Sequence, residues 1–237
     1  MPNVVVDTSV SLPATLSPGG ARRKLWIVLA FGALTYEVEH GLLELDALRA
    51  QVDQEGGVVG GIENSLERLE RASDRRAALA ELLPYGTPDN WIAIGSRPLF
   101  EEYERKLREV GTRLDPHLRR EDVPLLRRQM EAVCAIAAPP FADSAVPVLT
   151  ADPKDDPILY TALSAKADLL ISSDKHLVPD RREELWEHEA GTVLALTFET
   201  LLADRLSGVD WDGIDGSWLT LAYDQPTEKS PERDSNS

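Results

Sequence analysis

Three scarcities in the sequence each exclude a class of protein. The 237 residues include a single cysteine, Cys134, which excludes an internal disulfide and a cysteine-based metal site. In the apolar run AVCAIAA this cysteine is expected to be a buried core thiol. No apolar run is long enough to cross a bilayer, so we expect no membrane span. Bases are also scarce: 25 lysines and arginines face 41 acids, and the formal net charge of −16 argues against a broad basic surface for duplex nucleic acid.

The length predicts one domain, with room for an insertion or a tail but hardly for a second full core. We place this domain at residues 1–206. Residues 38–84 combine narrow helical stripes with dense charge and a glycine-rich break, which predicts an inserted helical hairpin. Residues 207–223 form an extension, and residues 224–237, without apolar content, are expected to be a disordered acidic tail. The N-terminal MPNVVVDTSV lacks the pattern of a signal peptide, so the expected location is cytoplasmic.

Apolar runs that alternate with helical patterns are the main positive signal. Strands are predicted at the VVV run before Asp7 and at residues 91–95, 145–149, 168–173 and 192–196. Helices are predicted at residues 21–37, 97–110, 122–137, 155–165 and 198–206, with a loop at residues 11–20. Strands alternating with helices predict an α/β fold, a three-layer α/β/α sandwich with a mainly parallel central sheet.

Two of the predicted strands end in an acid. Asp7 follows the first apolar run and Asp174 follows the run at 168–173. Ligands of open α/β sheets bind beyond the carboxyl ends of the strands, so both acids are candidates for a site at that edge. Each acid alone also has an ordinary explanation, since Asp155 could cap a helix, Asp174 could begin a turn and Glu102 could lie on a solvated helix face.

The segments VVVDTSVSLPATLSPGGA and DPKDDPILYTALSAKADLLISSDKHL resemble the PIN-domain family, in particular its bacterial VapC-like toxin ribonucleases. The resemblance covers about residues 1–37 and 90–206, and it implies a PIN-like fold. It assigns the four acids of the family's metal site, one each in DTSV, SRPLFEEYERKLREV, DPKDDP and LISSDKHL: Asp7, Glu102, Asp155 and Asp174. Ser172 takes the threonine place of the family's Thr-x-Asp pattern.

The sequence departs from the family pattern at two places near these acids. Asp156 stands beside Asp155 where relatives often carry asparagine, so the register of the third ligand could shift by one. His176 stands where many relatives carry a further acid. Its imidazole could reach a metal or a metal-bound water, and the alternative is a loop histidine without a role.

Four carboxylates suit Mg²⁺ or Mn²⁺, which prefer hard oxygen ligands. Two carboxylates about 4 Å apart repel by roughly 4 kcal/mol at an effective dielectric of 20, so such a cluster implies a cation. The cation would also offset acidic charge where a phosphate lies, so the net charge does not exclude a nuclease. Thr8 and Ser172 are candidate donors that hold the ligands in place. A short basic cluster could contact the RNA backbone, with plain solvation an equal alternative: Arg22, Arg23 and Lys24.

The favoured hypothesis is a metal-dependent endoribonuclease, the toxin of a toxin–antitoxin pair, with RNA, an antitoxin protein and a second copy of the chain as candidate partners. The alternative is a catalytically weak PIN-fold module that binds RNA or a protein. A phosphatase of the haloacid dehalogenase type would need a second acid two residues after the first. Ser9 stands there instead, so this third reading is discounted.

Overall fold

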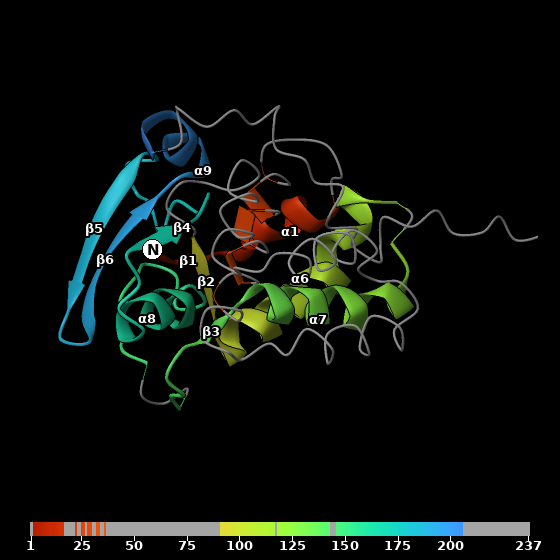
Figure 1. Cartoon of the computed structure of the whole chain (residues 1–237), viewed down its shortest axis with the longest axis horizontal. Helices are drawn as coiled ribbons and strands as arrows, with labels where there is room; N and C mark the ends of the chain where they lie inside the picture. The colour runs from red at the N-terminus through yellow and green to blue at the C-terminus, as the bar shows by residue number, and fades with distance from the viewer. Residues whose placement is uncertain are drawn as a thin grey trace, which may run out of the picture.

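The computed structural model describes residues 2–16, 91–116, 118–142 and 146–205, together with scattered residues between 22 and 36 (Figure 1). The hairpin predicted at 38–84, the extension at 207–223 and the tail at 224–237 lie outside the described residues. Of the helix predicted at 21–37, the described residues are helical, and Leu25, Trp26 and Leu29 are buried in the core. Among the described helices, none is long and apolar enough to cross a membrane.

A six-stranded, mostly parallel sheet forms the centre of the fold, which confirms the predicted α/β class (Figure 1). Its order is β3-β2-β1-β4-β6-β5. The strands are β1 (Asn3–Val6), β2 (Ile92–Gly95), β3 (Ile136–Ala137), β4 (Leu169–Ile171), β5 (Glu183–His188) and β6 (Gly191–Leu196). Only β5, at one edge, runs antiparallel to its neighbour within this sheet.

The central strands β1 and β4 are apolar apart from Asn3, because both of their faces are covered. Val4, Val5 and Val6 are all buried, as are the three residues of β4. Val6 pairs with Ile171, so the two strands end side by side. A parallel strand buried on both faces shows a continuous apolar run rather than an alternation, which is why these two strands could be predicted.

The helices pack around this sheet in two groups (Figure 1). They are α1 (Thr8–Leu16), α6 (Arg97–Leu114), α7 (Val123–Val133), α8 (Asp156–Ser164) and α9 (Phe198–Thr200), the last followed by a π-helical turn at Leu201–Arg205. Helix α6 packs between α1 and α7, and α8 lies against β1, β4 and β6. The start of α6 is fixed by Ser96, whose hydroxyl accepts a hydrogen bond from the Leu99 amide (3.3 Å), with a proline in the first turn.

The loop predicted at residues 11–20 is wrong in its first half, because α1 begins directly after Asp7 and continues to Leu16. The helix is buried on most of its surface, so its sequence shows no polar face, and Pro13 inside it suggests a break. Thr15 is also buried, and its hydroxyl lies 2.7 Å from the Tyr103 hydroxyl of α6.

Two further predicted elements differ from the structure, and two strands were not predicted. The helix predicted at 122–137 ends at Val133 as α7, and Ile136–Ala137 instead pairs with β2 as strand β3. Residues 146–149 form no strand, because Pro147 lacks an amide donor and the Leu149 amide bonds to Asp156 instead. Strand β5 was not predicted.

Cys134 follows α7 and packs against the core, where burial of the thiol, followed by the charge of Glu131, raises its pKa to about 12. A thiol with such a pKa is a poor nucleophile at neutral pH. The cysteine therefore contributes packing to the end of α7 rather than reactivity. Its Cβ also lies close to Gly95 of β2, where any larger residue would collide with it.

Candidate active site

Asp7 and Asp174 lie at the same edge of the sheet, as the sequence predicts. Asp7 directly follows β1, and Asp174 lies three residues beyond the end of β4. The Asp7 amide donates a hydrogen bond to the Ile171 carbonyl (2.9 Å), which extends the pairing of the two strands by one step. This edge is the carboxyl end of the parallel strands, where α/β folds bind ligands.

The Asp7 carboxylate is buried and held by donors on both oxygens. Its Oδ1 accepts a hydrogen bond from the Thr8 amide (2.6 Å). Its Oδ2 accepts from the Ser172 hydroxyl (2.7 Å) and from the Ser9 hydroxyl (2.5 Å). Thr8 and Ser172 are thus placed as predicted, whereas Ser9 was not named for this role. The DTS sequence offered the signal, since a serine two residues after an aspartate often bonds back to it.

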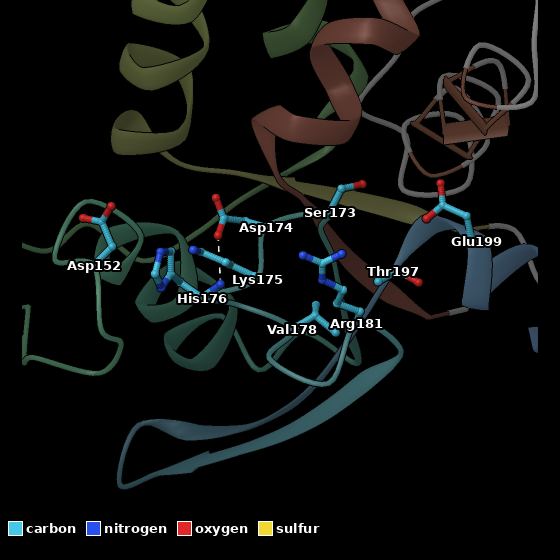
Figure 2. A pocket seen from close by; sticks show the side chains of 9 residues that line it. All are labelled: Asp152, Ser173, Asp174, Lys175, His176, Val178, Arg181, Thr197 and Glu199. Atoms are coloured by element: carbon cyan, nitrogen blue, oxygen red, sulfur yellow. Dashed lines mark hydrogen bonds between the residues drawn. The ribbon is translucent and has the colours of Figure 1, made fainter.

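Ser172 also connects Asp7 to the Asp174 loop. Its hydroxyl accepts a hydrogen bond from the Asp174 amide (2.9 Å) while it donates to Asp7. The Asp174 carboxylate then accepts from the His176 amide (2.8 Å), which closes a tight turn after β4 (Figure 2). One buried serine therefore fixes two of the four predicted acids relative to each other.

Glu102 reaches the same region from α6. Its side chain is 16% exposed, and its Oε1 accepts a long hydrogen bond from the Thr8 hydroxyl (3.4 Å). Burial raises the pKa of the Glu102 carboxyl, and the Asp7 charge raises it further, while Lys106 and Arg105 act in the opposite direction. Thr8, next to Asp7, thus links the α6 acid to the acids at the strand ends.

Asp155 and Asp156 have different environments despite being adjacent. The Asp156 side chain is 3% exposed, and its Oδ1 accepts hydrogen bonds from the Thr150 amide (2.7 Å), the Thr150 hydroxyl (2.8 Å) and the Leu149 amide (3.2 Å). Asp155 precedes α8 but makes no capping bond, and its Oδ2 is buried without a partner among the described residues. Asp156 therefore anchors the preceding loop, and Asp155 is the acid turned toward the other three.

The charges of the other three predicted acids perturb the ionisation of Asp155. The pKa of Asp155 is raised from 3.8 to about 7, first by burial and then by the charges of Asp174, Asp7, Asp152 and Glu102. Like charges held together in a partly buried place disfavour the ionised form of each member. The structure thus brings Asp7, Glu102, Asp155 and Asp174 into one electrostatic cluster around Asp155.

The donors of this cluster fit a hard divalent cation, although their side chains do not converge on one point. Within the described ranges, no three His, Cys, Asp or Glu side chains lie in an arrangement that could hold a metal ion as it stands. A bound cation would nevertheless give the unpartnered Oδ2 of Asp155 a partner, and the oxygen-only donor set is the kind that a hard cation prefers. It would also favour the ionised forms of Asp155 and Glu102, whose pKa values are raised without it.

A cleft of about 630 Å³ opens beside Asp174 (Figure 2). Its walls combine charged groups of both signs, among them Asp152, Asp174, Lys175, His176, Arg181 and Glu199. His176, which stands in place of a further acid, thus has its side chain in the cleft wall. A volume of this size accommodates a nucleotide-sized ligand.

The basic cluster predicted to contact RNA is described only at Arg22. Its guanidinium lies over the Phe198 ring (5.6 Å to the centroid) and pairs with Glu199 (3.1 Å). Arg23 and Lys24 lie outside the described residues. Arg22 is therefore engaged with protein groups at the rim of the cleft.

Comparisons of the chain with family models, with curated proteins and with solved structures gave no match. The interpretation of the site thus depends on the geometry and chemistry given above.

Proposed function

We propose that the chain is a metal-dependent endoribonuclease with a PIN-like, three-layer α/β/α fold, and that it acts as the toxin of a toxin–antitoxin pair. One observation carries the proposal. The carboxylates of Asp7, Glu102, Asp155 and Asp174 come from four separate elements to one edge of the sheet, where burial, followed by the charges of neighbouring acids that include the other three, raises the pKa of Asp155 to about 7. An arrangement that stores repulsion in the absence of a cation is typical of a site built to bind one.

The choice of RNA and of the toxin class comes from the resemblance of the DTSV, DPKDDP and LISSDKHL segments to VapC-like ribonucleases. The same resemblance makes an antitoxin protein and a second copy of the chain the expected partners. The geometry supports this choice through the position of Asp174, which belongs both to the acidic cluster and to the wall of a nucleotide-sized cleft.

Each acid has its own part in the proposed reaction. A bound Mg²⁺ or Mn²⁺ would polarise the scissile phosphate and lower the pKa of an attacking water. Asp7, Asp155 and Asp174 would hold it, with Asp7 kept in one orientation by Thr8 and Ser172. Glu102 would be a further ligand or would orient the water and accept its proton, a role that its raised pKa suits.

The decisive experiment is incubation of the purified chain with single-stranded and structured RNAs in Mg²⁺, in Mn²⁺ or in EDTA. We expect cleavage only with metal, and its loss in Asp7→Asn and in Glu102→Gln. Glu101→Gln is the matched control, because Glu101 adjoins Glu102 but is exposed and pairs with Arg97 (2.7 Å). Cleavage that persists in EDTA or in Asp7→Asn would show a contaminating nuclease and contradict the assignment.

The second candidate is a catalytically weak PIN-fold module that binds RNA or a protein. Two observations favour it: the four acids as placed do not form a metal-holding group in the described part of the chain, and His176 replaces an acid. RNA binding without metal-dependent cleavage, equal in wild type and Asp7→Asn, would select this candidate over the nuclease.

A further inference from the structure

Two positively charged side chains line the cleft beside Asp174 without an ion-pairing partner in the described part of the chain. Among the described residues, neither Lys175 nor Arg181 has a hydrogen-bonding or ion-pairing partner for its side chain, and both are exposed. Arg182, next in the chain, pairs with Asp204 (3.1 Å) and does not line the cleft. Two adjacent arginines thus differ in that one is engaged with the protein and the other is directed into the cleft.

The acids that line the same cleft already interact with other groups of the protein or belong to the acidic cluster. Glu199 pairs with Arg22 (3.1 Å), and an oxygen of Asp152 accepts a hydrogen bond from the Lys154 amide (3.1 Å). Asp174 belongs to the cluster that would face the cation. Lys175 and Arg181 are therefore available to bind a ligand that enters the cleft, and their positive charges favour an anion.

The backbone conformation of Arg181 places its side chain in the cleft. Its φ of 55° lies in the left-handed region, which is unusual for an arginine, and its amide bonds to the Val178 carbonyl (2.9 Å) to close the turn after Asp174. Figure 2 shows its guanidinium directed toward the side of the cleft where Ser173 and Asp174 lie. A guanidinium presents its donors in a fork that matches phosphate oxygens.

We propose that Lys175 and Arg181 bind a phosphate of an RNA strand next to the phosphate that is cut, so that the cleft holds the intervening nucleotide. The inference rests on the proposed function, because it takes the acidic cluster with Asp174 as the place of cleavage. Lys175 and Arg181 are substrate-binding residues in this arrangement. They fix the position of the strand and take no part in the bond-breaking step.

Binding is measured first, without metal, so that the result does not depend on nuclease activity. A fluorescein-labelled single-stranded 10-mer RNA is titrated with full-length Asp7→Asn protein in EDTA at low salt, followed by fluorescence anisotropy. Arg181→Ala on this background should weaken binding about tenfold and reduce the slope of log K against log salt by about 0.7. Arg182→Ala should change the affinity by less than about twofold, because its exposed ion pair lies outside the cleft.

Cleavage provides the second measurement. With metal present, Arg181→Ala and Lys175→Ala should raise KM for the 10-mer while leaving kcat nearly unchanged. A dinucleoside monophosphate has no neighbouring phosphate, so its cleavage should be insensitive to both substitutions. An equal loss on both substrates would mean that these residues act on the bond itself, and the proposal would be wrong.

The experiments can overturn the nuclease assignment and the phosphate-binding site independently of each other. Arg181-dependent RNA binding in EDTA by a chain that never cleaves would overturn the nuclease and uphold the phosphate site. Metal-dependent cleavage with equal binding by Arg181→Ala and Arg182→Ala would uphold the nuclease and overturn the phosphate site, as would a failure of the Asp7→Asn parent to bind the 10-mer. If inorganic phosphate competes as tightly as the 10-mer itself binds, the cleft is a site for a free anion, and its assignment to a strand is wrong.

Discussion

Ser172 donates a hydrogen bond to the Asp7 carboxylate across 2.7 Å, and the two residues come from neighbouring parallel strands that are 165 positions apart in sequence. The same hydroxyl accepts from the Asp174 amide (2.9 Å). A buried group that donates to one acid and accepts from the backbone of another sets the distance between them. The relative position of Asp7 and Asp174 therefore depends in part on Ser172, which is 0% exposed. Ser9 makes a second link, because its hydroxyl donates to Asp7 and accepts from the Ser173 amide (2.9 Å).

Substitution of Ser172 by alanine should lower both stability and activity. It removes a donor to a buried carboxylate and leaves the Asp174 amide without its acceptor, which should reduce the free energy of unfolding by about 1–3 kcal/mol. Ser173→Ala is the matched control, because Ser173 is exposed and its hydroxyl makes no hydrogen bond with the described residues. Urea denaturation of both variants tests this. Equal stabilities would show that the hydrogen bonds of Ser172 do not contribute to the stability of the fold.

Alanine at Asp155 and at Asp156 should have opposite effects on the stability of the metal-free protein. Asp156→Ala removes the acceptor of three hydrogen bonds from Leu149 and Thr150, two of them buried, which should cost about 2–4 kcal/mol. Asp155→Ala removes a carboxylate that makes no capping bond and is repelled by its neighbours, so stability should stay level or rise. Thermal melts in EDTA measure both, and a large loss in Asp155→Ala would show that Asp155 serves the fold.

The raised pKa of Asp155 also predicts how stability depends on pH. Between about 3.8, its ordinary value, and about 7, the folded protein holds a proton that the unfolded chain has released. The unfolded state thus binds fewer protons, and the contribution of Asp155 to stability falls as pH rises through this window, then stays constant above it. Urea midpoints of wild type and Asp155→Asn in EDTA should therefore diverge from pH 4 to pH 7, with wild type losing more. Parallel curves would contradict the raised pKa.

The sequence predicted strands β1 and β4 because each contains a run of adjacent apolar residues. The runs before Asp7 and Asp174 are strands buried on both faces, and they read as continuous apolar segments. Strand β5 escaped prediction because it is an edge strand with the sequence EELWEH, in which charged side chains alternate with partly buried ones. Helix α1 escaped it for the opposite reason, since a helix that is buried nearly all round has no polar face to mark its period.

The sequence also could not assign the role of each acid in the candidate site. Sequence alone left open whether Asp155 or Asp156 faces the other acids, because both precede Pro157 at the start of one helix. The difference is made by Thr150, whose amide and hydroxyl both bond to Asp156. A hydrogen bond between a loop and a helix six residues away is a tertiary contact, and no spacing rule within the helix predicts it.

Stabilisation by Mn²⁺ should distinguish a shared metal site from four acids with unrelated roles. If Asp7, Glu102, Asp155 and Asp174 hold one divalent ion, Mn²⁺ at a hundredfold excess over its dissociation constant should raise the free energy of unfolding of wild type by about 2.7 kcal/mol. Asp155→Asn and Asp174→Asn should gain much less, because each removes a ligand. Glu101→Gln, which alters an exposed acid paired with Arg97, should gain as much as wild type.

Thermal melts of these four proteins, with Mn²⁺ and with EDTA, measure the gain directly. In EDTA, the melting temperatures of the two Asn variants should equal or exceed that of wild type, because each substitution removes a repelling charge. Acids that only cap helices or form turns would give the reverse order, a loss of about 0.5–2 kcal/mol in each variant. If wild type ignores Mn²⁺ and both variants melt lower in EDTA, the acids do not share an ion and the proposed nuclease loses its physical basis.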